Sequence, residues 1–317
     1  MKRLFSLLAS ALLLNASPPA AAEPAIKVTP VQVSKHAWYV RGLSGPASAA
    51  NQGFNSNAGF VVTPAGVIVI DALGTVPLGE AMLKAIRSVT DQPVRRVIVT
   101  HYHADHVYGL APFKAAGAEI WAHREAREYL ESGEGAARLT QRRRDLAPWV
   151  DANMRLVAPD RPLEGDTSFS LGGLQFDILY MGPAHAPDDL VVVVREDQVL
   201  FTGDILFSGR VPFVGNADSK RWLAAMDRLL ALQPKVMVPG HGAASRNPVA
   251  DLAFTRDYLR YLRETMGKAA EEMQSFDEAY ARTDWSRYAK LPAFDAANRV
   301  NAYGTYLLME RELLERK

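Results

Sequence analysis

Three of the seven histidines of this 317-residue chain stand in one short segment, His101-Tyr102-His103-Ala104-Asp105-His106. The segment directly follows the apolar stretch 94–100, which predicts a short buried strand. Because alternate residues of a strand project to the same side, His101 and His103 can direct both imidazoles to one point. Asp105 and His106 lie in the following turn and can face a second point nearby. Imidazole and carboxylate ligands without thiolate suit Zn²⁺ and also accept iron or manganese.

These four side chains are too few to complete two metal sites. We therefore expect further ligands later in the chain, and three candidates follow apolar stretches: His185, Asp204 and His241. Each lies in or beside a turn that contains glycine, where the backbone can pack closely around a metal. Hydrophobic periodicity does not show whether the three segments converge on His101.

The composition narrows the chemistry and the partners. The chain has no cysteine, which excludes disulfides, thiolate zinc sites, iron–sulfur clusters and a cysteine nucleophile. Its 36 basic and 35 acidic residues give a formal charge of +1, a balance that does not favour a nucleic-acid partner. A small-molecule substrate is therefore the expected partner.

The first 22 residues have the layout of a secretory signal peptide. Lys2 and Arg3 precede an apolar run over 4–14, and small residues follow at 20–22. The apolar run is too short to cross a bilayer comfortably, and no later segment resembles a transmembrane helix. We expect cleavage after Ala22, a mature protein without a membrane span, and a periplasmic location.

Strand-like and helix-like stretches are mixed through both halves of the chain, which predicts an α/β fold with sheets covered by helices. No low-complexity linker divides it. We expect residues 23–245 to form one catalytic domain and residues 246–317 to form a C-terminal helical extension.

Local patterns predict several elements of this fold. A single strand is expected over 28–42, a hairpin over 58–71 and a helix over 77–89. The charged stretch 141–145 is interpreted as a solvated helix face, and His123 as a surface residue at the end of a strand.

Four short motifs in order, HYHADH, GPAH, TGD and PGHG, resemble the metallo-β-lactamase superfamily. The resemblance implies a four-layer αββα sandwich with a dinuclear metal site at one edge and two Zn²⁺ per chain. The residues that it assigns to the first metal are His101, His103 and His185. Those that it assigns to the second metal are Asp105, His106 and His241, and Asp204 would bridge the two.

The segment around the TGD motif, LFTGDILFSGRVPFVGNADSKRWL, is most similar to periplasmic zinc metallohydrolases of the quinoprotein-relay or SoxH-like group. That group accompanies quinone-cofactor dehydrogenases or sulfur-oxidation systems in bacteria. The resemblance therefore implies a functional link to a periplasmic dehydrogenase relay, in agreement with the predicted signal peptide.

The resemblance also implies an activity, a metal-dependent hydrolase that cleaves an ester, thioester, lactone or amide, with weak β-lactam cleavage included. A hydroxide shared by the two metals would attack the carbonyl carbon, and Asp105 would orient it as the catalytic carboxylate. Two alternatives stay open. One is a mononuclear iron persulfide dioxygenase, which uses fewer of the same ligands, and the other is a metal-binding partner of the relay without turnover.

Three side chains are candidate substrate-binding groups. Arg210 lies close to the TGD motif and either binds an anionic group or is an exposed loop arginine. Tyr102 and Tyr108 flank the histidine segment and can donate a hydrogen bond to an oxyanion, although aromatic residues at such positions more often pack. Asn55 and Asn57 are expected at the rim of the site.

Overall fold

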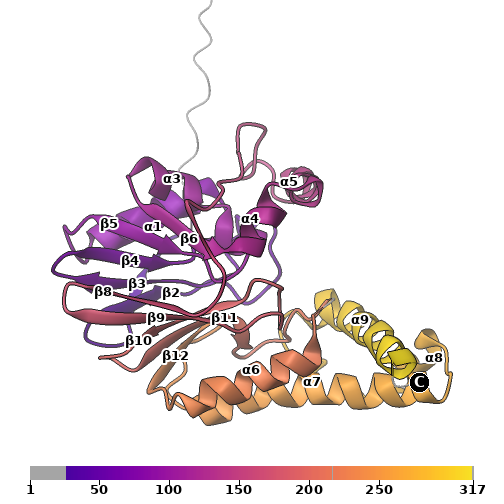
Figure 1. Ribbon diagram of the computed structural model, residues 1–317. Coiled ribbons are helices and arrows are strands. Elements are labelled where there is room, and N and C mark those ends of the chain that lie inside the picture. Colours follow the sequence, from indigo (N-terminus) through magenta and orange to yellow (C-terminus); the bar gives the residue numbers. More distant parts are fainter. Residues whose placement is uncertain (1–25, 216, 316–317) are drawn as a thin grey trace, which may run out of the picture.

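The computed structural model describes residues 26–215 and 217–315. Two β-sheets pack face to face, and helices cover the outer face of each, which gives the four layers of an αββα sandwich (Figure 1). This is the architecture expected from the sequence. The expected signal peptide, residues 1–22, lies outside the described residues.

The first sheet has seven strands in the order β1-β2-β3-β4-β5-β6-β7. The pairs from β1 to β4 are antiparallel, and those from β4 to β7 are parallel. The strands are β1 (Pro30–Gln32), β2 (Ala37–Val40), β3 (Ala58–Thr63), β4 (Gly66–Ile70), β5 (Val94–Ile98), β6 (Glu119–His123) and β7 (Arg161–Leu163).

The second sheet has five strands in the order β12-β11-β10-β9-β8. Only the pair β11 and β12 is parallel within it. The strands are β8 (Thr167–Leu171), β9 (Leu174–Tyr180), β10 (Leu190–Val194), β11 (Val199–Phe207) and β12 (Val236–His241).

Helices from the first half of the chain lie on the side of the first sheet, and those from the second half lie on the side of the second sheet (Figure 1). The former are α1 (Val76–Arg87), α2 (Ala104–Val107), α3 (Leu110–Ala115), α4 (Arg124–Leu130) and α5 (Gly133–Asp145). The latter are α6 (Ser219–Ala231), α7 (Pro248–Glu271), α8 (Phe276–Arg282) and α9 (Phe294–Glu315). Among the described residues, no helix is both long and apolar enough to cross a membrane.

The apolar core is divided by the sheets into three layers. In β4, Ile68 and Ile70 pack between the sheets, whereas Val67 and Val69 pack outward under the helices of the first side. Because both faces of this strand are covered, it is apolar along its whole length. A third layer joins the second sheet to α6, α7 and α9, so the C-terminal helices are packed onto the sandwich.

The local predictions hold for the hairpin and the helix but not for the first strand. The structure forms the hairpin as β3 and β4 and the helix as α1. The single strand expected over 28–42 is wrong, because a turn at Ser34-Lys35-His36 separates β1 from β2. The carboxylate of Asp197 holds this turn by accepting hydrogen bonds from the backbone N and the Nδ1 of His36, each at 2.8 Å.

Candidate metal centre

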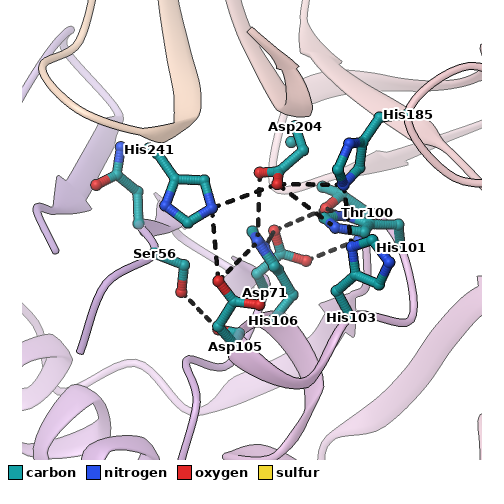
Figure 2. A network of polar contacts seen from close by, with 12 residues as sticks. Ser56, Asp71, Thr100, His101, His103, Asp105, His106, His185, Asp204 and His241 are labelled. Carbon is teal, nitrogen blue, oxygen red and sulfur yellow. Dashed lines mark hydrogen bonds and ion pairs between the residues drawn. The ribbon is translucent and has the colours of Figure 1, made fainter. Parts of the chain in front are cut away.

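The candidate ligands meet at one edge of the sandwich, where segments from both sheets end (Figure 2). The first sheet supplies the segment that follows β5 and continues into α2. The second sheet supplies the turn after β9, the strand β11 and the last residue of β12. Hydrophobic periodicity does not show whether the segments that carry His185, Asp204 and His241 converge on His101, but in the fold they do.

The seven side chains form two adjoining groups. Within each group the ligand atoms lie within 4.8 Å of one another. The first group is His101, His103, His185 and Asp204, and the second is Asp105, His106 and His241. Apart from Asp204, which the sequence resemblance places between the two metals, each group consists of the side chains that the resemblance assigns to one metal.

Asp204 faces both groups (Figure 2). Its Oδ2 lies 3.3 Å from Nε2 of His185 in the first group and 3.3 Å from Nε2 of His241 in the second. Its Oδ1 lies 3.4 Å from Nε2 of His106. Oδ2 therefore lies near both groups and Oδ1 near the second, so this carboxylate can serve two cations at once.

The donor set fits divalent cations. Nε2 of His101, Nε2 of His106 and Oδ1 of Asp204 are buried and have no hydrogen-bond partner. Leaving such atoms unsatisfied costs about 1–3 kcal/mol each, so clustered orphans of this kind indicate a missing partner. Cations bound in the two groups would satisfy all three atoms.

Burial keeps the first group ready to bind a metal. Desolvation lowers the pKa of His101 well below its usual range, that of His103 to about 3 and that of His185 to about 4. Burial alone would raise the pKa of Asp105, but His106 and His241 lower it to about 2. Neutral imidazoles and an ionised carboxylate are the forms that coordinate metals.

Three imidazoles are fixed from behind so that Nε2 faces the centre. Nδ1 of His106 lies 2.9 Å from Oδ2 of Asp71, and Nδ1 of His241 lies 2.6 Å from the backbone O of Asn55. Nδ1 of His101 lies 3.1 Å from Oγ1 of Thr100, which itself donates to Asp71. A proton on each Nδ1 leaves the Nε2 lone pair free for a metal.

Asp71 is the residue that sequence reasoning missed most clearly. It lies just past β4, is 3% exposed, and has a φ of +61°, a conformation that asparagine and aspartate adopt more readily than most residues. Its carboxylate also accepts from the backbone N of Thr100 at 2.7 Å. It carries no local motif, so only the fold reveals its position behind His106.

Of the two asparagines expected at the rim, Asn55 lines the pocket over the ligands, whereas Asn57 lies behind them. Asn55 donates from Nδ2 to Oδ2 of Asp105 at 2.9 Å. Asn57 is 2% exposed and donates to the backbone oxygens of Pro239 and Gly242, on either side of His241. Both therefore hold the second ligand group in place.

Gly240 is required by the close approach of Asp204. A Cβ atom at position 240 would lie 1.9 Å from Oδ1 of Asp204. The glycine in the PGHG motif therefore has a steric reason, because any side chain there would displace the shared carboxylate.

The ligands open into a pocket of about 770 Å³ of open space. Arg210 lines it and is 5% exposed, so it is not an exposed loop arginine. Tyr102 lines a neighbouring pocket and stacks on Tyr129 with ring centroids 3.9 Å apart. Tyr108 is 3% exposed and belongs to the core under the first sheet.

Two other sequence interpretations are corrected. His123 is buried, stacks on Tyr180 and caps the first turn of α4, so it is not a surface residue. The stretch 141–145 is not wholly a solvated face, because Arg142 is half-buried and lines the pocket together with Arg138. The charge pattern of α5 does not predict this position of Arg142, because only the fold brings the helix beside the ligands.

The αββα sandwich and the two ligand groups at its edge are features of a metal-binding hydrolase fold. The model of the metallo-beta-lactamase superfamily matches residues 51–241, which is more than half of the chain. The chain belongs to the metallo-beta-lactamase superfamily.

Curated relatives of this chain are hydrolases. A linear primary-alkylsulfatase from a Pseudomonas species is 26% identical over 240 residues, which cover 65% of this chain and 45% of the relative. A metallo-beta-lactamase type 2 from Bacteroides fragilis is 28% identical over 190 residues, which cover 56% of this chain and 68% of the relative. The chain thus spans less than half of the alkylsulfatase. Superfamily membership and these relatives support a metal-dependent hydrolase.

Solved structures share the fold. A metallo-beta-lactamase from Pontibacter korlensis matches with a TM-score of 0.58 and 23% identity, covering 74% of this chain and 99% of that one. The sec-alkylsulfatase Pisa1 from a Pseudomonas species matches with a TM-score of 0.67 and 20% identity, covering 89% of this chain and 50% of that one. Residues 1–245 alone cannot supply that 89%, so the likeness to Pisa1 extends into the C-terminal helices.

Proposed function

We propose that the protein is an exported dinuclear zinc hydrolase that cleaves an ester, thioester, lactone or amide bond. The observation that carries the proposal is the position of Asp204 between two complete ligand groups. Imidazole and carboxylate ligands are those that zinc prefers when no thiolate is present. A mononuclear iron enzyme would leave the second group without a purpose.

Two metals bound here would supply a water of lowered pKa and a Lewis acid for the carbonyl oxygen. Asp105 is the ligand placed to act on that water, because its side chain is 16% exposed and lines the pocket. Asn55 fixes its Oδ2, which leaves the carboxylate oriented toward the pocket. The carboxylate of Asp105 would accept the proton that the water loses as it adds to the carbonyl carbon, and would deliver that proton to the leaving group as its bond to the carbon breaks.

Substrate binding involves Arg210 and Tyr102 in this proposal. Arg210 is buried beside the second ligand group, with Nη1 3.3 Å from Nδ1 of His241, and can attract an anionic substrate group. Tyr102 follows His101 directly and faces the neighbouring pocket. The β-lactamase relatives make β-lactams a substrate to test, although the chain is only distantly similar to them.

Alkyl sulfates are a second candidate substrate class. One observation favours them: the likeness to the sec-alkylsulfatase structure includes C-terminal helices, and helix α9 borders the pocket through Ala296 and Ala297. A sulfate ester would meet the same arginines as a carboxylate. Sulfate release and acid release from an ester are separable assays.

The cellular setting completes the proposal. We propose that the signal peptide directs the protein to a bacterial periplasm, and that it belongs to the quinoprotein-relay or SoxH-like group. It would then act on a small molecule beside a periplasmic dehydrogenase relay. Detection of the mature protein in a periplasmic fraction, beginning at Glu23, is the expected result, and retention of the full chain in the membrane fraction would contradict it.

The test is hydrolysis by the zinc-loaded mature protein over a panel of aryl esters, thioesters, lactones, β-lactams and alkyl sulfates. The His101→Ala/His103→Ala double variant should lose turnover of whichever class is cleaved. His36→Ala, which removes an imidazole far from the site in the sequence and in the fold, should retain it. Persistent turnover in the double variant would reject the mechanism, and oxygen uptake with one iron per chain would favour the dioxygenase.

A further inference from the structure

The pocket over the second ligand group is lined by three guanidinium groups. Arg138 and Arg142 come from α5, one turn apart, and Arg210 comes from the segment after β11. The acidic residues in its lining are Asp105 and Asp204, which are already committed to the candidate metals. The rest of the wall includes Asn55, Phe213 and small apolar residues, Ala296 and Ala297 of α9 among them.

Two of these guanidinium groups have unused donors. Arg210 is 5% exposed, yet no carboxylate among the described residues lies within the 4 Å of an ion pair to it. Its Nη1 and Nε instead meet the backbone oxygens of Gly45 and Val211, each at the long distance of 3.4 Å. Nε of Arg142 is buried without a hydrogen-bond partner, and its Nη1 forms only a long ion pair with Oδ2 of Asp145, at 3.8 Å. Buried cationic donors in this state favour a bound anion.

A second pocket, with about 1270 Å³ of open space, begins over the first ligand group. It shares His103, Arg138 and Phe213 with the first pocket, so the two pockets meet above the metal ligands. Its lining combines aromatic and apolar residues, Tyr102 and Val300 among them, with the polar side chains of Glu134 and Gln141. Phe213 is 40% exposed and Val300 is 51% exposed, so apolar surface continues to its mouth.

We propose that the substrate is an amphiphilic monoanion whose two halves occupy the two pockets. The anionic group binds Arg138, Arg142 and Arg210 beside the second ligand group, and the apolar half contacts Tyr102, Phe213 and Val300 beside the first. The bond to be cleaved then lies over the ligands where the pockets meet. This inference rests on the proposed hydrolase function and assigns its substrate class.

The test measures binding rather than turnover, so its result does not depend on which bond is cleaved. Calorimetric titration of the zinc-loaded protein uses 4-phenylbutanoate and its uncharged amide. The Arg138→Gln/Arg142→Gln variant should bind the carboxylate about tenfold more weakly, because charged hydrogen bonds are lost. Arg144→Gln removes one positive charge from an exposed position of α5 outside both pockets and should bind as the wild type does.

The apolar half is tested in the same way. Butanoate, which lacks the phenyl ring, should bind the wild type about tenfold more weakly than 4-phenylbutanoate. In Val300→Asp, an exposed position where folding should not suffer, this difference should shrink. Equal affinities in the α5 double variant and Arg144→Gln, or no gain from the phenyl ring, would overturn the inference. Intact binding with no hydrolysis of any panel substrate would instead reject the proposed function alone.

Discussion

Replacing Asp71 with asparagine should weaken the second metal site while leaving the fold in place. Asparagine tolerates the positive φ at this position, so the backbone is not strained by the change. The carboxylate currently accepts three hydrogen bonds, of which Oδ2 takes those from Thr100 Oγ1 at 2.8 Å and His106 Nδ1 at 2.9 Å. An amide has only one oxygen, so its NH₂ group must face one of these donors.

The magnitude follows from the tautomer of His106. If the amide nitrogen faces His106, the proton must move to Nε2, which then cannot bind a metal. Loss of such a supporting partner typically lowers metal affinity about 10–100-fold, which corresponds to about 1.4–2.7 kcal/mol. His106 belongs to the second ligand group, so the first zinc should bind nearly as before.

The assay is a zinc titration in competition with a chromophoric chelator, which gives two stepwise dissociation constants. Asp197→Asn is a matched control, because Asp197 also accepts from a histidine Nδ1, at 2.8 Å from His36, away from the site. The control should retain both zinc affinities. Two wild-type dissociation constants in Asp71→Asn would show that Asp71 does not orient His106 as argued.

Three further predictions concern metal geometry, pH and metal removal. In Gly240→Ala the new Cβ would lie 1.9 Å from Oδ1 of Asp204, so metal analysis after dialysis should find that both ions are lost. The control Gly165→Ala adds a Cβ that meets nothing within 4 Å, and it should keep both ions. Burial, and then the charge of Asp189, raise the pKa of Asp188 in the folded protein. The protonated side chain therefore contributes to the stability of the fold fully below the unfolded pKa, and this contribution is lost as the pH rises through the folded pKa. Denaturation in urea should therefore show that the unfolding free energy falls more steeply for the wild type than for Asp188→Asn as the pH rises above about 4, the usual pKa of aspartate, by up to about 1.4 kcal/mol per pH unit. Chelation of the metals should lower the melting temperature measured by calorimetry, because zinc at about 100 times its dissociation constant contributes about 2.7 kcal/mol.

Each of these predictions has an outcome that contradicts it. Full metal content in Gly240→Ala would mean that the shared carboxylate can move without loss of the site. Parallel pH curves for the wild type and Asp188→Asn would mean that the buried acid is ionised or solvated. A melting temperature that chelation does not change would mean that no metal is bound to the folded protein.

The sequence predicts the parts of the site that have a local signature. The segment from His101 to His106 combines a strand end with a dense cluster of ligand side chains, and the hairpin of β3 and β4 has alternating apolar residues around a turn. Such features depend on neighbours in the chain.

The roles that sequence reasoning missed depend on contacts between distant segments. Asp71 supports His106 across 35 positions, and Asn55 reaches His241 across 186. Arg142 resembles a solvated helix residue in the sequence and becomes part of the pocket only when α5 packs beside the ligands. Likewise, His123 has charged neighbours in the chain but an aromatic neighbour, Tyr180, in the fold. Hydrophobic periodicity indicates which face of a helix or strand is apolar, but it does not indicate which segment packs against that face.

Metal content is the measurement that tests the central claim most directly. The mature protein is purified without added metal, titrated with zinc, dialysed and analysed by inductively coupled plasma mass spectrometry. A dinuclear hydrolase is expected to hold two zinc ions per chain. The zinc content should be lower in Asp204→Asn, because both groups lose their shared ligand. One tightly bound iron per chain, or a protein that takes up no metal on titration, would contradict it.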